Sequence, residues 1–345
     1  MKTLSPQNTF PDQSASLRDA GFDLHHCTLC PRECGADRIS GSVGYCGVPY
    51  DLYAGRAALL AWEEPCLTGE KGSGAVFFSG CSMGCIFCQN AAISGSRGNF
   101  RRNEAGAAFP GIRITPERLK ETFLTLQDEG AATINLVTPT HYLHHIIPAL
   151  ESARREGLSV PVIYNTSAYE KADSLKALEG LVDIYLPDLK YCSSGLSAAY
   201  SNAPDYFGRA KEAVAEMVRQ QPVPVFAQVT PAEGTADEDE VPEPQMLKGV
   251  IVRHLALPGC GEDSRAVLRY LYETYGNRIY ISLMNQYTPM PAVKNDPQLG
   301  HVLREEEYDA LVDYMLGLGV ENGFIQEGGT ASESFIPAFD GTGLL

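Results

Sequence analysis

Apolar residues along this chain gather in short continuous runs, and a stretch with helical spacing follows most of them. The runs cover residues 75–79, 133–137, 160–164, 182–186, 250–255 and 279–283. The helical stretches start at Thr115-Pro116-Glu117, where a capping residue precedes a proline, and then cover residues 143–156, 174–179, 209–220, 264–275 and 305–318. A continuous apolar run without alternation is typical of a parallel strand that is buried on both faces.

Six consecutive strand–helix units predict an α/β protein with a parallel sheet and helices packed outside it. A closed barrel of this kind needs eight units, so we expect an open, partial (β/α)6 barrel, with a doubly wound flat sheet as the second candidate. We expect an irregular or disordered N-terminus over residues 1–23, a cysteine-rich module with its connector over 24–72, the barrel over 73–330 and a tail over 331–345. Residues 230–244 are acidic and rich in proline, which predicts an exposed loop.

The balance of charge narrows the class of partner. The chain carries a formal net charge of −16, which disfavours nucleic acid or an anionic membrane surface as a partner and is also typical of a soluble surface. No stretch approaches the roughly 20 apolar residues of a membrane span. The first 23 residues contain no apolar segment of the kind found in secretory signals, so we expect a cytoplasmic protein.

The chain has ten cysteines, and seven of them fall in two tight clusters. Because the cytoplasm keeps thiols reduced, ligation of a metal or an iron–sulfur cluster is expected before disulfides. The clusters are Cys81, Cys85 and Cys88, and then Cys27, Cys30, Cys34 and Cys46. Cys192 and Cys260 have no partner at ligand spacing, and we expect them to be lone buried thiols.

The cluster at Cys81, Cys85 and Cys88 stands directly after the first predicted strand, where barrel enzymes place their active sites. Its C-x3-C-x2-C spacing lets three soft thiolates converge on an iron–sulfur cluster or on zinc, and Gly80 and Gly84 permit tight turns. Three ligands leave one corner of a four-iron cluster open, and an open position is typical of a catalytic site. The alternative is a zinc knuckle whose fourth ligand, such as Cys66, lies elsewhere.

The N-terminal cluster supplies four thiolates within a short segment that is rich in glycine and proline. Four ligands would close a tetrahedral zinc site or fill a second [4Fe–4S] cluster, so this site is expected to be structural or to relay electrons. The sequence does not distinguish a zinc ion from an iron–sulfur cluster at these four cysteines. Reduced thiols without a metal are the third alternative.

Polar residues follow the ends of the predicted strands. Because the carboxyl ends of parallel strands meet at one edge of a sheet, these residues are candidates for a shared binding site. They are Thr138, Thr140, Asn165, Thr166, Asp188, Lys190, Arg253 and His254. Each group also has a plain alternative. Asp188 and Lys190 could form a surface ion pair worth under about 1 kcal/mol, and Asn165 and Thr166 could cap a helix. Arg253 and His254 could be solvated or have structural roles.

The segment GCSMGCIFCQN resembles the signature loop of the radical S-adenosylmethionine (SAM) superfamily, in the branch related to pyruvate formate-lyase activating enzymes. The segment CTLCPRECGADRISGSVGYCG resembles the N-terminal module of the PflX-like branch of that superfamily. The resemblance covers nearly everything from Cys27 to Gly343 and implies a radical SAM barrel. It also implies that Cys81, Cys85 and Cys88 hold a [4Fe–4S] cluster whose open iron binds SAM.

The resemblance further implies a reaction in which an electron donor such as flavodoxin or ferredoxin drives cleavage of SAM. The products would be methionine and a 5′-deoxyadenosyl radical, which abstracts a hydrogen atom from a substrate. Phe87 would pack near the adenine, with a core phenylalanine as the alternative, and the strand-end residues would contact the rest of SAM. Many activating enzymes carry Gly-Gly-Glu where this chain has Thr138-Pro139-Thr140, so hydroxyl and carbonyl oxygens would receive the SAM ammonium group here.

The sequence therefore predicts a radical SAM enzyme. Its target is either a glycine in a partner glycyl radical enzyme or a small molecule or peptide. A protein of another class, a non-catalytic iron–sulfur electron carrier or redox sensor, is the alternative, and such a protein would not cleave SAM.

Overall fold

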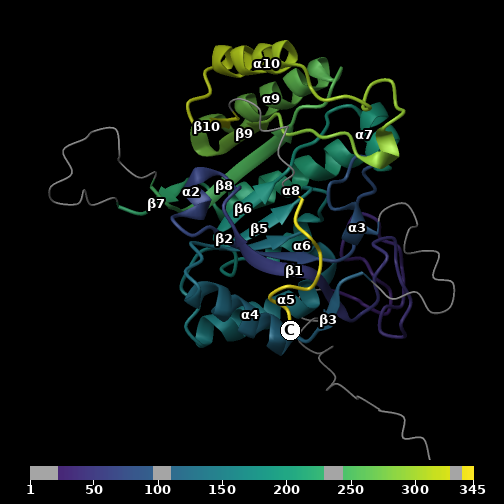
Figure 1. Cartoon of the computed structure of the whole chain (residues 1–345), viewed down its shortest axis with the longest axis vertical. Helices are drawn as coiled ribbons and strands as arrows, with labels where there is room; N and C mark the ends of the chain where they lie inside the picture. Colours follow the sequence, from purple (N-terminus) through teal and green to yellow (C-terminus); the bar gives the residue numbers. More distant parts are fainter. Residues whose placement is uncertain (1–21, 96–109, 229–243, 327–335) are drawn as a thin grey trace, which may run out of the picture.

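A mixed sheet of ten strands forms the centre of the part of the chain that the computed structural model describes, residues 22–95, 110–228, 244–326 and 336–345 (Figure 1). The strand order is β10-β9-β8-β6-β5-β4-β2-β1-β3, and β7 pairs with β8 off this path. The strands are β1 (Leu52–Leu60), β2 (Ser73–Phe78), β3 (Ile112–Ile114), β4 (Ile134–Val137), β5 (Val162–Thr166), β6 (Ile184–Pro187), β7 (Val225–Phe226), β8 (Met246–Leu255), β9 (Tyr280–Met284) and β10 (Gly323–Ile325).

The strands from β2 through β4, β5, β6, β8 and β9 to β10 are all parallel. Six of them are the six predicted strands, and β10 is an additional short strand at the edge. Within the described residues, β10 and β3 are the two ends of the strand order and do not pair with each other, so the sheet stays open. The predicted α/β class and the open parallel sheet are confirmed.

The predicted helices form close to their expected bounds. The helices are α2 (Pro65–Thr68), α3 (Ala91–Ser94), α4 (Pro116–Asp128), α5 (Leu143–Arg155), α6 (Ala172–Lys176), α7 (Ser194–Ser201), α8 (Tyr206–Gln220), α9 (Gly261–Tyr275) and α10 (Glu305–Leu318). The cap predicted for α4 is present, because Thr115 Oγ1 accepts a hydrogen bond from the Arg118 amide at 3.1 Å. In the described part of the chain, no helix combines the length and the apolar composition that a membrane crossing would need.

The long helices pack on one face of the sheet, which we call the outer face. Alternate strand residues such as Val76, Leu136 and Val252 share one core with buried residues of α4, α5, α8, α9 and α10. The residues between them, such as Ala75 and Ile163, belong to separate small clusters that contain no residue of these five helices. This one-sided arrangement is that of a barrel wall, whereas a doubly wound sheet would have helices on both faces.

The opposite, inner face of the sheet is covered by short segments from both ends of the described chain. Cys66 and Leu67 of α2 pack against Ile163, Ile184 and Ile251 on this face. Near the C-terminus, the ring of Phe339 lies 5.6 Å from that of Phe77. These segments leave a hollow over the carboxyl ends of the strands, and the hollow contains the site described below.

The strand β1 lies in the segment that the sequence indicated only as a connector. It pairs antiparallel with β2 from Ala54–Phe78 to Leu60–Ser73 and carries the short strand β3 on its other side. Its residues, LYAGRAALL, do not alternate between apolar and polar side chains, so the pattern gave no strand signal. Small residues are needed in β1 because the C-terminal segment packs closely against it. A Cβ atom at Gly55, for example, would lie 3.2 Å from the Phe339 ring.

The N-terminal cysteine module packs against the N-terminal end of α5, and a fully buried arginine forms part of this contact. Arg38 donates hydrogen bonds to the carbonyl oxygens of His141, at 2.6 Å, and Pro49, at 2.7 Å. The His144 and His145 rings both hydrogen-bond the carbonyl of Tyr50, at 3.0 and 2.8 Å. The module is therefore joined to the barrel by buried polar contacts.

The last described residues, 336–345, return to β1 and pass over it in Figure 1, where the yellow trace ends at the C mark. The Ala57 amide donates to the carbonyl of Thr342 at 2.8 Å, and the Gly341 amide donates to the carbonyl of Gly55 at 2.9 Å. Two expectations lie largely outside the described residues: the irregular N-terminus, of which 1–21 are not described, and the exposed loop, of which 229–243 are not described.

Candidate functional site

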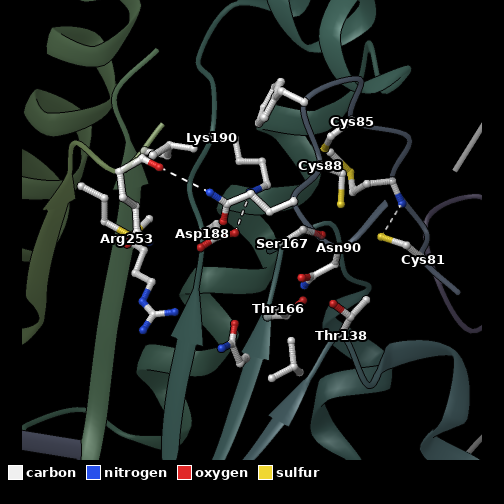
Figure 2. Close-up of a pocket in the computed structure, with 18 of the residues that line it drawn as sticks. Cys81, Cys85, Cys88, Asn90, Thr138, Thr166, Ser167, Asp188, Lys190 and Arg253 are labelled. Atoms are coloured by element: carbon white, nitrogen blue, oxygen red, sulfur yellow. Dashed lines mark hydrogen bonds and ion pairs between the residues drawn. The ribbon is translucent and has the colours of Figure 1, made fainter. Parts of the chain in front are cut away.

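A cavity of about 270 Å³ opens at the carboxyl ends of the parallel strands, close to the lower limit of roughly 300 Å³ for small-molecule sites. One wall is the loop after β2 and the opposite wall is formed by β8 and β9 (Figure 2). Ten residues from the sequence prediction line it: Cys81, Cys85, Cys88, Phe87, Thr138, Asn165, Thr166, Asp188, Lys190 and Arg253. The fold therefore brings together residues that are spread over more than half of the chain.

The three loop cysteines form one wall of the cavity (Figure 2). The loop turns at Gly80, whose φ of +91° suits glycine, and a Cβ atom there would lie 2.9 Å from the carbonyl oxygen of Cys46. Cys81 Sγ accepts a hydrogen bond from the Met83 amide at 3.4 Å. The close approach of Gly80 to Cys46 places the loop against the N-terminal module, and the three cysteines line the cavity.

The electrostatics of these thiols favour a cationic occupant. Burial raises the pKa of Cys88 to about 11, and the nearby Cys85 adds to the rise. Burial also raises the pKa of Cys81, with further contributions from Cys88 and Cys85. Three thiolates can be stable together in such a place only if a positive group such as iron compensates them. The donor set thus fits an iron–sulfur cluster, although no three His, Cys, Asp or Glu residues in the described chain are arranged to hold a single metal ion.

The alternative ligand Cys66 lies elsewhere. It is 1% exposed and packs among the apolar residues of the inner face beneath β5 and β6, and it does not line the cavity. The zinc knuckle that needed Cys66 is therefore not formed. Of the two cysteines expected to be lone and buried, Cys260 is buried, but Cys192 is only half-buried, because it lies in the turn just before α7.

Asp188 and Lys190 stand in the middle of the cavity (Figure 2). Lys190 Nζ lies 2.6 Å from Asp188 Oδ2, and the two side chains are 16% and 23% exposed, so this is not the surface ion pair of the plain alternative. Burial alone would lower the pKa of Lys190, but the Asp188 carboxylate raises it above its ordinary value. The lysine is a fixed positive charge at pH 7 beside the thiols.

Thr138 occupies a strained backbone position at the end of β4. Its φ is +58°, a left-handed conformation that is an outlier for a β-branched residue. Its amide donates to the carbonyl of Asn165 at 2.9 Å, which joins the ends of β4 and β5. A glycine would take this conformation freely, whereas the threonine takes it with backbone strain.

Two predicted contacts do not reach the cavity. Thr140 is buried and donates a hydrogen bond to Glu170 Oε1 at 2.5 Å. His254 is 1% exposed, and its Nδ1 lies 2.8 Å from the carbonyl oxygen of Leu189. Burial lowers the pKa of His254 to about 4, so it is neutral at pH 7 and ties β8 to the end of β6.

The sequence analysis missed Glu170. Its Oε1 accepts hydrogen bonds from Thr140 and from Thr166, which lines the cavity. Burial raises the pKa of Glu170 to about 7, against the lowering effect of the two threonines. This carboxyl group supports the end of β5 from behind the cavity, and its neutral and charged forms are both populated near neutral pH.

The sequence analysis also missed the pair Glu63 and Glu64, which holds Arg253. Arg253 Nη2 donates to Glu63 and, at 2.5 Å, to Glu64, and Arg253 Nε donates to Glu64 at 2.8 Å. In Figure 2 the guanidinium group of Arg253 points away from the cysteines. The sequence signal for this pair was two adjacent acids within the apolar stretch 57–67.

The N-terminal cysteines lie behind the cavity. Cys27, Cys30 and Cys46 are buried and Cys34 is exposed. A hydrogen bond with Cys27 lowers the pKa of Cys34 to about 5 and raises that of Cys27. The Cys81 amide donates to the Cys46 carbonyl at 3.3 Å, so the two cysteine clusters are in direct backbone contact. A metal at these four thiols stays a prediction.

No protein-family model matches this chain. Among curated proteins it is similar to the uncharacterized protein MJ0674 of Methanocaldococcus jannaschii, with 23% identity over 294 residues that cover 84% of this chain and 73% of the relative. Nothing in that relative's name assigns an activity.

Several solved structures overlap with the fold. SuiB of Streptococcus suis, bound to its precursor peptide SuiA, aligns with 13% identity over 73% of this chain and 48% of SuiB, with a TM-score of 0.45. A domain of pyruvate-formate lyase-activating enzyme from Bacteroides vulgatus aligns with 12% identity over 54% of this chain and 92% of the domain, with a TM-score of 0.35. The maturase HydG of Carboxydothermus hydrogenoformans aligns with 15% identity over 74% of this chain and 53% of HydG, with a TM-score of 0.41.

The chain thus spans about half the length of SuiB. All three TM-scores are below 0.5.

Proposed function

We propose that this chain is a radical SAM enzyme that uses a [4Fe–4S] cluster on Cys81, Cys85 and Cys88 to cleave SAM reductively. One observation carries the proposal: three thiols from one short loop share a cavity with the Asp188–Lys190 pair at the strand ends. A structural metal knuckle has no need of a cavity or of a buried ion pair facing it. A simple electron carrier would not need them either.

When bound, the cluster supplies the electron that breaks the C5′–S bond of SAM, giving methionine and a 5′-deoxyadenosyl radical that abstracts hydrogen. The residues of this chain bind SAM and orient it. Lys190 provides a fixed positive charge for the SAM carboxylate, and Asp188 keeps it charged and can accept hydrogen bonds from ribose hydroxyls. Asn165 and Thr166 present further polar atoms at the next strand end.

Phe87 contributes an apolar surface beside the cysteines. It is 6% exposed, lines the cavity, and its ring lies 6.1 Å from that of Tyr287 in an edge-on arrangement. An adenine ring could stack in such a place and be shielded from water. Shielding also protects a radical from solvent and from side reactions.

The finer assignments are part of the proposal. The enzyme would be an oxidoreductase of the activating-enzyme type, acting in the cytoplasm with flavodoxin or ferredoxin as electron donor. A glycine in a glycyl radical enzyme is the first candidate target, and a small molecule or a peptide side chain is the second.

The test is anaerobic reconstitution with iron and sulfide, followed by dithionite and SAM, with 5′-deoxyadenosine measured by chromatography. We expect product from the wild type and none from Cys85→Ala. Cys192→Ala, a half-buried cysteine outside the cavity, is the matched control and should keep full activity. Absence of product from reduced, cluster-loaded wild type would exclude the proposal, and full activity in Cys85→Ala would exclude the ligand assignment.

A further inference from the structure

Arg32 connects three parts of the molecule that meet at the cysteine loop. It belongs to the N-terminal module, where it stands between the second and the third cysteine. Its Nε donates a hydrogen bond to the carbonyl oxygen of Ser82 at 2.8 Å, and its Nη1 donates to the carbonyl oxygen of Asn202 at 2.7 Å. Ser82 directly follows Cys81, and Asn202 is the C-cap residue of α7. One side chain therefore joins the module, the cysteine loop and α7.

The cysteine loop is supported on the same two sides by its own backbone. The Ile86 amide donates to the carbonyl oxygen of Tyr200 at 2.9 Å, close to the end of α7. On the side of the module, the Cys81 amide donates to the carbonyl oxygen of Cys46 at 3.3 Å. Arg32 extends from one of these supports to the other, so the position of the loop depends on it.

Two tyrosine rings fix the guanidinium group of Arg32. Its Cζ lies 3.9 Å from the ring centroid of Tyr45 and 4.9 Å from that of Tyr169. The rings are themselves hydrogen-bonded: Asn202 Nδ2 donates to the Tyr45 hydroxyl at 2.8 Å, and the Tyr169 hydroxyl donates to Asp205 Oδ1 at 2.8 Å. A planar cation over aromatic faces is both attracted and held in orientation.

The charge of Arg32 is not compensated by an acid. Among the residues that the structure describes, no carboxylate forms an ion pair with it: Glu33 pairs with Lys171 at 2.6 Å, and Asp205 pairs with Arg209 at 3.4 Å. The acceptors of Arg32 are neutral carbonyl oxygens, and its Nη2 is shielded from solvent without an acceptor among the described residues. A full positive charge is thus fixed beside the cysteine loop.

Such a charge matters for a cluster on the three loop cysteines. Reduction adds one electron to a site that already contains three thiolates, so a nearby cation stabilises the reduced form more than the oxidised form. Lys190 also lies beside these thiols, but Asp188 balances its charge at 2.6 Å. The unpaired charge of Arg32 therefore has the larger effect per cation.

We propose that Arg32 is a positioning residue for SAM cleavage: it fixes the cysteine loop against α7, and its unpaired charge makes the cluster on that loop easier to reduce. The step concerned is the uptake of one electron by the oxidised cluster from a reductant such as dithionite. The inference rests on the proposed function, because it needs that cluster. It gives the N-terminal module a role in the reaction that does not depend on a metal of its own.

The test is a redox titration with dithionite, followed by electron paramagnetic resonance, on the cluster-loaded protein. Arg32→Gln removes the charge, and we expect a roughly tenfold smaller ratio of reduced to oxidised cluster at a given potential, which is a midpoint about 59 mV lower. Arg32→Lys keeps the charge and should restore most of the shift. Arg304→Gln makes the same change in net charge at a side chain that is 68% exposed, and should leave the midpoint unchanged.

A second variant leaves the arginine in place and decides the matter if Arg32→Gln does not load a cluster. Asn202→Asp puts a carboxylate beside the guanidinium group, and aspartate tolerates the left-handed φ of +51° at this position. Pairing with this carboxylate should also lower the midpoint. A wild-type midpoint in Arg32→Gln or in Asn202→Asp would overturn the proposal. A fall in Arg32→Lys as large as that in Arg32→Gln would overturn it too.

The two proposals fail separately. If the wild type forms 5′-deoxyadenosine but the variants keep its midpoint, the role of Arg32 is wrong and the radical SAM assignment stands. If the midpoint falls as expected but the reduced wild type forms no 5′-deoxyadenosine, the radical SAM assignment is wrong and Arg32 still acts on a reducible cluster.

Discussion

Ser201 Oγ donates a hydrogen bond to Cys85 Sγ at 3.0 Å, across 116 residues of chain. The hydroxyl groups of Ser201 and Tyr191 lie 2.9 Å apart and are hydrogen-bonded to each other, so a short chain of hydroxyl groups ends on the thiol. Ser201 is the last residue of α7, which places this helix directly beside the cysteine loop. Hydrogen bonds to sulfur are one of the means by which proteins set the potential of an iron–sulfur cluster.

Ser201→Ala should therefore make the cluster harder to reduce, because the donor no longer stabilises the added negative charge. A hydrogen bond worth about 1 kcal/mol corresponds to a shift on the order of −40 mV for one electron. The measurement is a redox titration followed by electron paramagnetic resonance. Ser197→Ala on the same helix, whose hydroxyl bonds the Ser194 carbonyl, is the control. An unchanged potential in Ser201→Ala would mean that the hydroxyl has no effect on the cluster.

Asp188→Asn should weaken SAM binding about tenfold, since the lysine charge beside it loses its partner and the carboxylate no longer accepts two hydrogen bonds. Equilibrium dialysis with labelled SAM measures this on the cluster-loaded protein. Asp173→Asn, in an exposed pair with Lys176, should bind SAM as the wild type does. Equal affinity in both variants would place SAM elsewhere.

Glu170→Gln should change how stability depends on pH. The folded pKa of about 7 lies above the reference value of 4.5. The neutral form thus stabilises the fold below pH 4.5, and this contribution is lost as pH rises through 7. The wild type should lose about 3 kcal/mol more than Glu170→Gln between pH 4.5 and 8. Urea unfolding at pH 4.5 and pH 8 measures the difference, and parallel behaviour of the two proteins would contradict the prediction.

Arg38→Met should loosen the N-terminal module, because the carbonyl groups of His141 and Pro49 lose buried donors. The expected loss is about 3 kcal/mol in the free energy of unfolding, within the range for removing one partner of a buried polar network. Urea unfolding is the assay. Arg155→Met, at the exposed end of α5, should cost under about 0.5 kcal/mol. Similar losses in the two variants would show that the buried hydrogen bonds of Arg38 contribute no more to the free energy of unfolding than the exposed Arg155 does.

The N-terminal module should keep a metal of its own. A variant with Cys81, Cys85 and Cys88 all changed to alanine should still contain zinc or iron when analysed by mass spectrometry. Adding Cys46→Ala to that variant should remove it. If the first variant contains neither metal, the module holds reduced thiols and Cys34, with its pKa of about 5, is open to oxidation.

The sequence predicted the parallel strands and the cysteine loop because each is encoded within a few consecutive residues. Each parallel strand from β2 to β9 is an apolar run, and the cysteine loop is defined by its spacing. The strand β1 was missed because its small residues fit the C-terminal segment, which lies far away in the chain. Glu63 was missed because its partner Arg253 is 190 residues away.

Part of the error at the site was avoidable. Arg253 and His254 are consecutive residues of β8, and consecutive strand residues point to opposite faces of a sheet. Arg253 faces the cavity, so His254 had to face the other side, where it holds the end of β6. By contrast, no rule of spacing could have indicated that Thr140 and Thr166 share the buried carboxyl group of Glu170.

The return of residues 336–345 to β1 has a consequence for biosynthesis. Phe77 and Phe339 touch across the inner face, and about 260 residues separate them. At ~5–20 residues per second, they leave the ribosome on the order of tens of seconds apart. Pro337, which completes one side of the cavity, arrives equally late. During that interval the thiols of Cys81, Cys85 and Cys88 lack this wall, so they are reached from solvent by a route that the finished protein closes.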